Sequence, residues 1–138
     1  TIGMKRRDFI ICSAAALTLP AMARAATEYT PGLVQKHLAA GDTVFLDFKA
    51  SWCTTCAAQE RVIDALRQSN PAYNAAVTFI NVDWDQHSKS DLARSLKIPR
   101  RSTLVALKGD KELGRIVAGT SKSQIQGLMD LALGAATS

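Results

Sequence analysis

Residues 43–56 constrain the fold of this 138-residue chain more than any other stretch. They begin with an almost continuous apolar run that predicts a buried strand over 43–49, interrupted only by Asp47. A corner of small residues follows, and two cysteines three positions apart, Cys53 and Cys56, then open a helical pattern. A Cys-x-x-Cys motif at a strand-to-helix junction is typical of a redox site.

Elementary chemistry predicts a role for each polar group of this stretch. Cys53 falls at the start of the helix, where unpaired backbone N–H groups favour an anion, so we expect a lowered thiol pKa and a reactive thiolate. Cys56 lies one turn later and is the natural resolving thiol. Asp47 lies on a strand covered on both faces, and burial should raise the pKa of its carboxyl. A carboxylate of that kind is suited to accept the proton of Cys56.

The pattern Asp-Phe-x-Ala-x-Trp-Cys-x-x-Cys, from Asp47 to Cys56, resembles the active-site segment of the thioredoxin family. The Thr-Thr pair between the cysteines is similar to the pairs of secreted or periplasmic members, such as the C-terminal domain of the membrane reductase DsbD. The resemblance extends from about Pro31 to Leu133. It implies an α/β thioredoxin fold, a central mixed β-sheet flanked by helices on both faces, with Trp52 in the site and no cofactor beyond the Cys53–Cys56 disulfide.

Periodicity and turn residues predict the order of the elements along the rest of the chain. We expect a short edge strand over 26–29, helices over 31–40, 53–68 and 88–96, strands over 77–83, 103–107 and 112–117, and a last helix after Thr120 or Ser121. Thr30 and Ser88 are the expected N-caps, and residues 72–76 are expected to form a connection. Gln59 is expected on the solvent side of its helix and Leu131 or Ala132 on the inner side. Trp84 is either a ligand contact or a core residue.

The segment before Thr103 departs from the family pattern. Thioredoxins carry a cis-proline just before the Thr-Leu pair that begins this strand, and here that position is Ser102. A cis bond before serine costs roughly 3–4 kcal/mol, so either that strain is borne or the loop is trans and reshaped. The resemblance implies that Ser102, Arg101 and Thr103 contact the substrate. Arg100 and Arg101 either favour the thiolate and acidic substrates, or form a solvated basic loop.

The first 25 residues predict an export signal. Met4-Lys5-Arg6-Arg7 is a basic start, an apolar run follows from Phe9 to Ala21, and Ala23-Arg24-Ala25 has the pattern of a cleavage site. The Arg6-Arg7 pair resembles a twin-arginine signal, although an ordinary export signal can also carry two arginines. We therefore expect a signal peptide over 1–25, with three residues ahead of Met4 that do not belong to it, a single thioredoxin-like domain over 26–138, and a periplasmic location.

Charge and cysteine content narrow the function classes. The net charge of +5 includes four basic residues and one acid from residues 1–25, so residues 26–138 carry only about +2. The basic pI therefore does not indicate a nucleic-acid-binding surface on residues 26–138. Only Cys53 and Cys56 fall within residues 26–138, so their use in chemistry is favoured over a structural disulfide framework.

Three function classes remain open at this stage. The first is a periplasmic thiol–disulfide oxidoreductase that reduces protein disulfides through Cys53 and Cys56, or that runs in reverse as a disulfide donor. The second is a Cys-x-x-Cys metal-binding module, although His37 and His87 are not at ligand spacing and we expect no metal site. The third is a non-catalytic binding domain. For the first, the family suggests a membrane electron donor of the DsbD or CcdA type, and a monomer.

Overall fold

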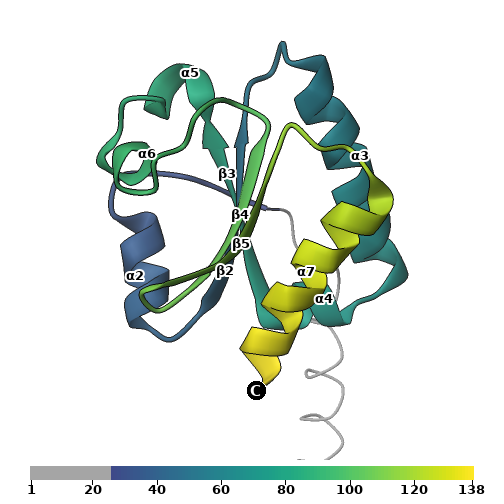
Figure 1. Ribbon diagram of the computed structural model, residues 1–138. Coiled ribbons are helices and arrows are strands. Elements are labelled where there is room, and N and C mark those ends of the chain that lie inside the picture. Colours follow the sequence, from purple (N-terminus) through teal and green to yellow (C-terminus); the bar gives the residue numbers. More distant parts are fainter. Residues whose placement is uncertain (1–25) are drawn as a thin grey trace, which may run out of the picture.

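The computed structural model describes residues 26–138, which form a five-stranded mixed sheet with helices on both faces (Figure 1). The strands are β1 (Thr27–Glu28), β2 (Thr43–Lys49), β3 (Val77–Asp83), β4 (Thr103–Lys108) and β5 (Lys111–Val117). Their order across the sheet is β1-β3-β2-β4-β5. Strands β1, β3 and β2 pair in parallel, whereas β4 runs antiparallel to β2 and to β5. The mixed sheet predicted from the sequence is therefore confirmed.

Two layers of helices cover the sheet, as Figure 1 shows. Helices α3 (Thr54–Ser69), α4 (Ala72–Ala76) and α7 (Lys122–Thr137) lie on one face. Helices α2 (Leu33–Ala39), α5 (Trp84–His87) and α6 (Asp91–Ser95) lie on the other. Within residues 26–138, no helix combines the length and the apolar character needed to cross a bilayer. The predicted export signal lies outside the described residues.

The central strand β2 contributes side chains to both halves of the core, because successive side chains of a strand point to opposite faces of the sheet. Val44, Leu46 and Phe48 pack in the apolar cluster beneath α2 and α6. Phe45 packs in the other cluster, beneath α3, α4 and α7. Asp47 alternates with Phe48 and so shares the face of Phe45. The one acid of the strand is thereby buried under α3, with 5% of its surface exposed.

Three local expectations were wrong at helix starts. Helix α2 begins at Leu33, and its N-cap is Gly32, whose φ of 88° is a left-handed conformation that glycine adopts readily. Thr30 and Pro31 therefore belong to the preceding turn and do not cap the helix. Residues 84–96 hold two short helices, and α6 is capped by the Ser90 hydroxyl, which accepts from the Ala93 amide at 3.2 Å. The expected connection at 72–76 is helix α4, whose Ala72 amide donates to the Asn70 side chain at 3.1 Å.

One side chain, Gln59, lies on the opposite side of its helix from the expectation, and of the pair Leu131 and Ala132 it is Ala132 that faces inward. Gln59 is fully buried, because it continues the inner stripe of α3 that runs through Cys56, Ile63 and Leu66. Leu131 is 54% exposed, whereas Ala132 is buried on the inner side of α7. The polar character of Gln59 concealed its position, and its partners belong to the site described next.

Candidate active site

The end of β2 and the start of α3 bring the two cysteines together. Cys53 is the N-cap of α3 in an extended conformation, and its sulfur accepts a hydrogen bond from the Cys56 amide at 3.1 Å. Both thiols are free and nearly enclosed, with 4% of Cys53 and 1% of Cys56 exposed. The predicted pairing of a helix-capping thiol with a second thiol one turn later is present in the structure.

The environment separates the two thiol pKa values. Burial alone would raise the pKa of Cys53, but hydrogen bonds from Cys56 and Ser102, together with Arg101, outweigh burial and lower this pKa to about 6. Burial raises the pKa of Cys56, and the adjacent Cys53 raises it further. At neutral pH Cys53 is therefore the thiolate and Cys56 the thiol, which are the states required of a nucleophile and a resolving group.

Asp47 lies behind the cysteines on the buried strand. Burial raises the pKa of its carboxyl to about 7, opposed by Lys49 and reinforced by the carboxylates of Glu60 and Asp64. One carboxyl oxygen, Oδ1, has no hydrogen-bond partner within residues 26–138. A carboxyl that changes protonation near neutral pH is suited to proton transfer.

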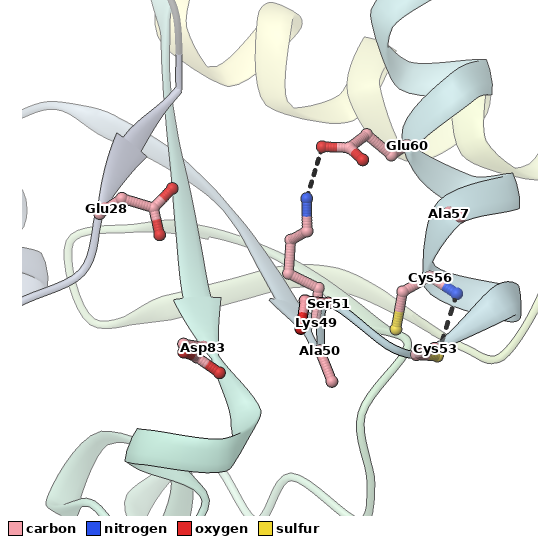
Figure 2. Close-up of a pocket in the computed structure, with 9 residues that line it drawn as sticks. All are labelled: Glu28, Lys49, Ala50, Ser51, Cys53, Cys56, Ala57, Glu60 and Asp83. Atoms are coloured by element: carbon pink, nitrogen blue, oxygen red, sulfur yellow. Dashed lines mark hydrogen bonds and ion pairs between the residues drawn. The ribbon is translucent and has the colours of Figure 1, made fainter.

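A pocket of about 350 Å³ opens beside the cysteines, between β1, β3 and α3. Figure 2 shows Lys49 extending toward Glu60 of α3, with which it forms an ion pair. Glu28 and Asp83 lie across the pocket, so its rim carries three carboxylates and one ammonium group. Both cysteines line this pocket, which is therefore the side from which the nearly enclosed Cys56 sulfur can be approached.

The loop before β4 holds Ser102 against both sulfurs. The Ser102 hydroxyl lies 3.2 Å from the sulfur of Cys53 and 3.1 Å from that of Cys56. No cis peptide bond occurs within the described part of the chain, and Ser102 has a φ of 65°. Of the two outcomes expected for this loop, the structure has the trans, reshaped one. Ser102 is fully buried and its backbone groups are already paired in the fold, so its contact with a substrate stays a prediction.

Trp52 and Arg101 form the outer wall of the site. Trp52 is 57% exposed, and its indole N–H donates to the Asp85 carboxylate at 3.0 Å. The Arg101 guanidinium stacks over the Trp52 ring at 4.5 Å from the centroid. Such stacking fixes the orientation of both side chains. Arg101 is placed beside Cys53 and helps to lower the pKa of its thiol, which agrees for this residue with the first of the two alternatives.

Thr103 and Arg100 shape the loop from within. The Thr103 hydroxyl donates to the Arg100 carbonyl at 2.7 Å, and Thr103 is fully buried. The Arg100 side chain donates to the carbonyl of Arg101 at 2.9 Å. In this arrangement Thr103 supports the loop that carries Arg101, and a direct contact of Thr103 with substrate is again a prediction.

Gln59 is the site residue that the sequence reasoning missed. Its side-chain amide donates to the carbonyl of Ser102 and to that of Gly119, each at 2.9 Å. It thereby ties α3 to the loops at the ends of β4 and β5. Gln59 lies three residues after Cys56 and four residues before Ile63, a spacing that places all three side chains on one face of a helix. This spacing was the signal in the sequence that Gln59 faces inward.

The structure places the two histidines away from the cysteines. His37 pairs with Asp42 at 2.8 Å, and His87 packs edge-on against Tyr29. Within residues 26–138, no three His, Cys, Asp or Glu side chains are grouped to hold a metal ion. Trp84 is half-buried, and it packs edge-on against Phe48 and beside the two cysteines.

Comparisons with known proteins agree with this geometry. The sequence model of the family described as Thioredoxin matches residues 25–130. Thioredoxin H2-2 of rice (Oryza sativa subsp. japonica) is 28% identical over 69% of this chain, and Thioredoxin H2-1 is 32% identical over 60% of it. The matches cover 66% and 55% of those two proteins, so the chain spans about two thirds and about half of their length.

Among solved structures, Trxlp from Edwardsiella tarda EIB202 is similar with a TM-score of 0.65 and 26% identity. That match covers 75% of this chain and 98% of Trxlp. The sheet order and the Cys53–Cys56 pair at the start of α3 are those of the thioredoxin class of proteins. The chain belongs to the thioredoxin family.

Proposed function

We propose that this protein is a periplasmic thioredoxin that reduces disulfides in exported proteins, within the group that includes the C-terminal domain of DsbD. The observation that carries the proposal is the paired environment of the thiols. Cys53 has a pKa lowered to about 6 at the start of α3, while the pKa of Cys56 is raised. Only one of the two sulfurs is then ready to attack at neutral pH.

The reaction proceeds in two exchanges. The Cys53 thiolate attacks a substrate disulfide, a Cys53–substrate mixed disulfide forms, and the first substrate thiolate leaves. Cys56 then transfers its proton to Asp47 and attacks the Cys53 sulfur, which releases the second substrate thiolate and leaves a Cys53–Cys56 disulfide. The substrate gains two electrons and the protein loses two, so a reductant must restore the dithiol. For this we propose a membrane donor of the DsbD or CcdA type.

The direction of electron flow is tested by the reduction potential of the Cys53–Cys56 pair in glutathione buffers. The Thr-Thr pair between the cysteines provides no histidine to stabilise the thiolate further, which supports the reducing direction. We expect a potential near about −270 mV, as in thioredoxin, and insulin reduction that Cys53→Ser abolishes. A potential near about −120 mV, as in DsbA, would make the protein a disulfide donor.

We further propose that the partners present acidic segments beside their disulfides. Arg101 stacks on Trp52 next to Cys53, and Arg100 holds the same loop, which supports this preference. The Arg100→Ala/Arg101→Ala double variant should reduce a disulfide peptide with flanking glutamates more slowly, with a smaller effect on the same peptide with flanking glutamines. Lys111→Ala, at the exposed start of β5, is the matched control. Equal losses for both peptides would contradict the proposal.

The periplasmic location rests on the sequence pattern of residues 4–25. Fractionation of cells that express the full chain tests it, and we expect a shortened protein in the periplasmic fraction. Replacement of Arg6 and Arg7 by lysine should stop export if the signal is of the twin-arginine type. Retention of the full-length wild-type chain in the cytoplasm would contradict the location without affecting the proposed chemistry. Gel filtration tests the proposed monomer.

A further inference from the structure

The Ser102 hydroxyl occupies the point between the two reacting sulfurs. Its oxygen is 3.2 Å from Cys53 and 3.1 Å from Cys56, and the residue is fully buried. A serine hydroxyl carries one proton and two lone pairs, so it can donate to only one sulfur at a time while it accepts from the other. When Cys53 is a thiolate and Cys56 a thiol, the Ser102 hydroxyl donates to the Cys53 sulfur, which also receives a hydrogen bond from the Cys56 side chain.

The fold fixes this hydroxyl from three sides. The Ser102 amide donates to the Phe48 carbonyl at 2.7 Å. Its carbonyl accepts from the Ala118 amide at 2.8 Å and from the Gln59 side chain at 2.9 Å. Its φ of 65° is uncommon for residues other than glycine. Because the backbone is anchored to β2, α3 and the end of β5 and the oxygen lies within reach of both sulfurs, the side chain can change its hydrogen-bond partner by turning its O–H alone.

The same hydroxyl acts on both thiol groups. Ser102 lowers the pKa of Cys53, where burial acts in the opposite direction. It also lowers the pKa of Cys56, although burial and Cys53 together keep that value raised. The two sulfurs are nearly equidistant from the oxygen, so a change of partner requires no movement of heavy atoms.

We propose that Ser102 is a catalytic residue whose hydroxyl donates to Cys53 in the first exchange and to Cys56 in the second. This inference rests on the proposed function and adds a step within it. Once Cys53 has formed the mixed disulfide, its sulfur carries no charge and is a poor acceptor. The O–H then turns to the Cys56 sulfur and stabilises it as a thiolate while the Cys56 proton passes to Asp47. Ser102 keeps its own proton throughout, and the S–S bond passes from the substrate to Cys56.

The test is a single-turnover reaction of the fully reduced protein with 5,5′-dithiobis(2-nitrobenzoic acid), followed by stopped flow at several pH values. Attack by Cys53 releases the first thionitrobenzoate, and attack by Cys56 on the mixed disulfide releases the second. Ser102→Ala and Ser102→Gly both remove the hydroxyl, and glycine suits the φ of 65° even where alanine disturbs the loop. Thr43→Val, which removes a buried hydroxyl at the other end of β2, is the control.

We expect both Ser102 variants to slow the second release about tenfold, because hydrogen bonds to charged groups are the strong ones. The thiolate absorbance of Cys53 should also titrate at a higher pH, and Thr43→Val should change neither readout. An unchanged second phase in a folded Ser102→Gly protein would overturn the proposal, as would a loss confined to the first phase. Failure of the wild-type protein to release a second thionitrobenzoate would instead refute the proposed function.

Discussion

Replacement of Asp47 by asparagine should stabilise the reduced protein at neutral and alkaline pH. The carboxyl is 5% exposed, and one of its oxygens has no partner within the described chain. Its folded-state pKa is about 7, against the ordinary value of 3.8. A group whose folded pKa is raised contributes stability at pH values below the ordinary pKa, and this contribution is lost as the pH rises through the folded value. The wild-type protein thus carries the cost of a buried charge above pH 7.

The magnitude follows from the two pKa values. The difference between about 7 and 3.8, at 1.36 kcal/mol for each pKa unit, corresponds to about 4 kcal/mol of unfolding free energy. Water that enters near the pocket would reduce this value, so about 4 kcal/mol is an upper figure. The side chain of asparagine is neutral at every pH. The stability difference between Asp47→Asn and wild type should therefore increase between about pH 4 and pH 8, by up to about 4 kcal/mol.

The assay is urea unfolding followed by circular dichroism, in steps from pH 4 to pH 8.5, with both proteins kept reduced. The lowered pKa of Cys53 adds a slope of the opposite sign in both proteins, and most of it is removed in the difference, because Cys53 is the smallest of the influences that act on the Asp47 pKa. Asp110→Asn, at the exposed turn between β4 and β5, is the matched control and should follow the wild-type profile. A difference that varies by less than about 1 kcal/mol across this range would refute the raised pKa of Asp47.

Three further predictions test other parts of the site and core. The thiolate absorbance of wild-type Cys53 should titrate with a midpoint near pH 6, and a midpoint near the ordinary thiol value of 9.0 would contradict the described environment. Gln59→Ala should lower the free energy of unfolding by about 2 kcal/mol, because two loop carbonyls lose their donor; unchanged stability in urea would show that water replaces it. Tyr73→Phe should lower the free energy of unfolding by about 1 kcal/mol in the same assay, because the hydrogen bond to Asp130 is lost, and no decrease would mean that this bond adds nothing net.

The sequence predicted the parts of the fold that depend on local pattern. The apolar run of β2 and the Cys-x-x-Cys motif located the site. The burial of Asp47 followed from its place on a doubly covered strand. These inferences succeeded because each depends on residues that are neighbours in the chain, where strand and helix periodicity are visible.

Features that depend on docking between distant segments were not predictable in this way. The expectation for Gln59 failed because its partners are carbonyls 43 and 60 residues away. The Lys49–Glu60 pair joins a strand to a helix across the pocket, and no periodicity indicates it. The departure at Ser102 was visible in the sequence. Its position between the sulfurs was not, since it depends on how three separate segments hold the loop.

Helix starts failed for a different reason. The segments 30–33 and 88–91 each offer more than one residue that can cap a helix or begin a turn. Ser88 and Ser90 are chemically equivalent as caps, but Ser88 ends helix α5 in a helical conformation, and the extended Ser90 is therefore the residue that caps α6. In the first segment, the left-handed conformation of Gly32 decides where the helix begins.

The placement of the tryptophans gives the protein an intrinsic optical reporter. The sequence contains two tryptophans, and both lie beside the cysteines: Trp52 immediately precedes Cys53, and Trp84 packs against the buried pair. Any change in charge or bonding at the sulfurs therefore occurs next to every indole in the chain. Emission from the unlabelled protein should follow the redox state of the dithiol in real time, without a coupled enzyme or an attached dye.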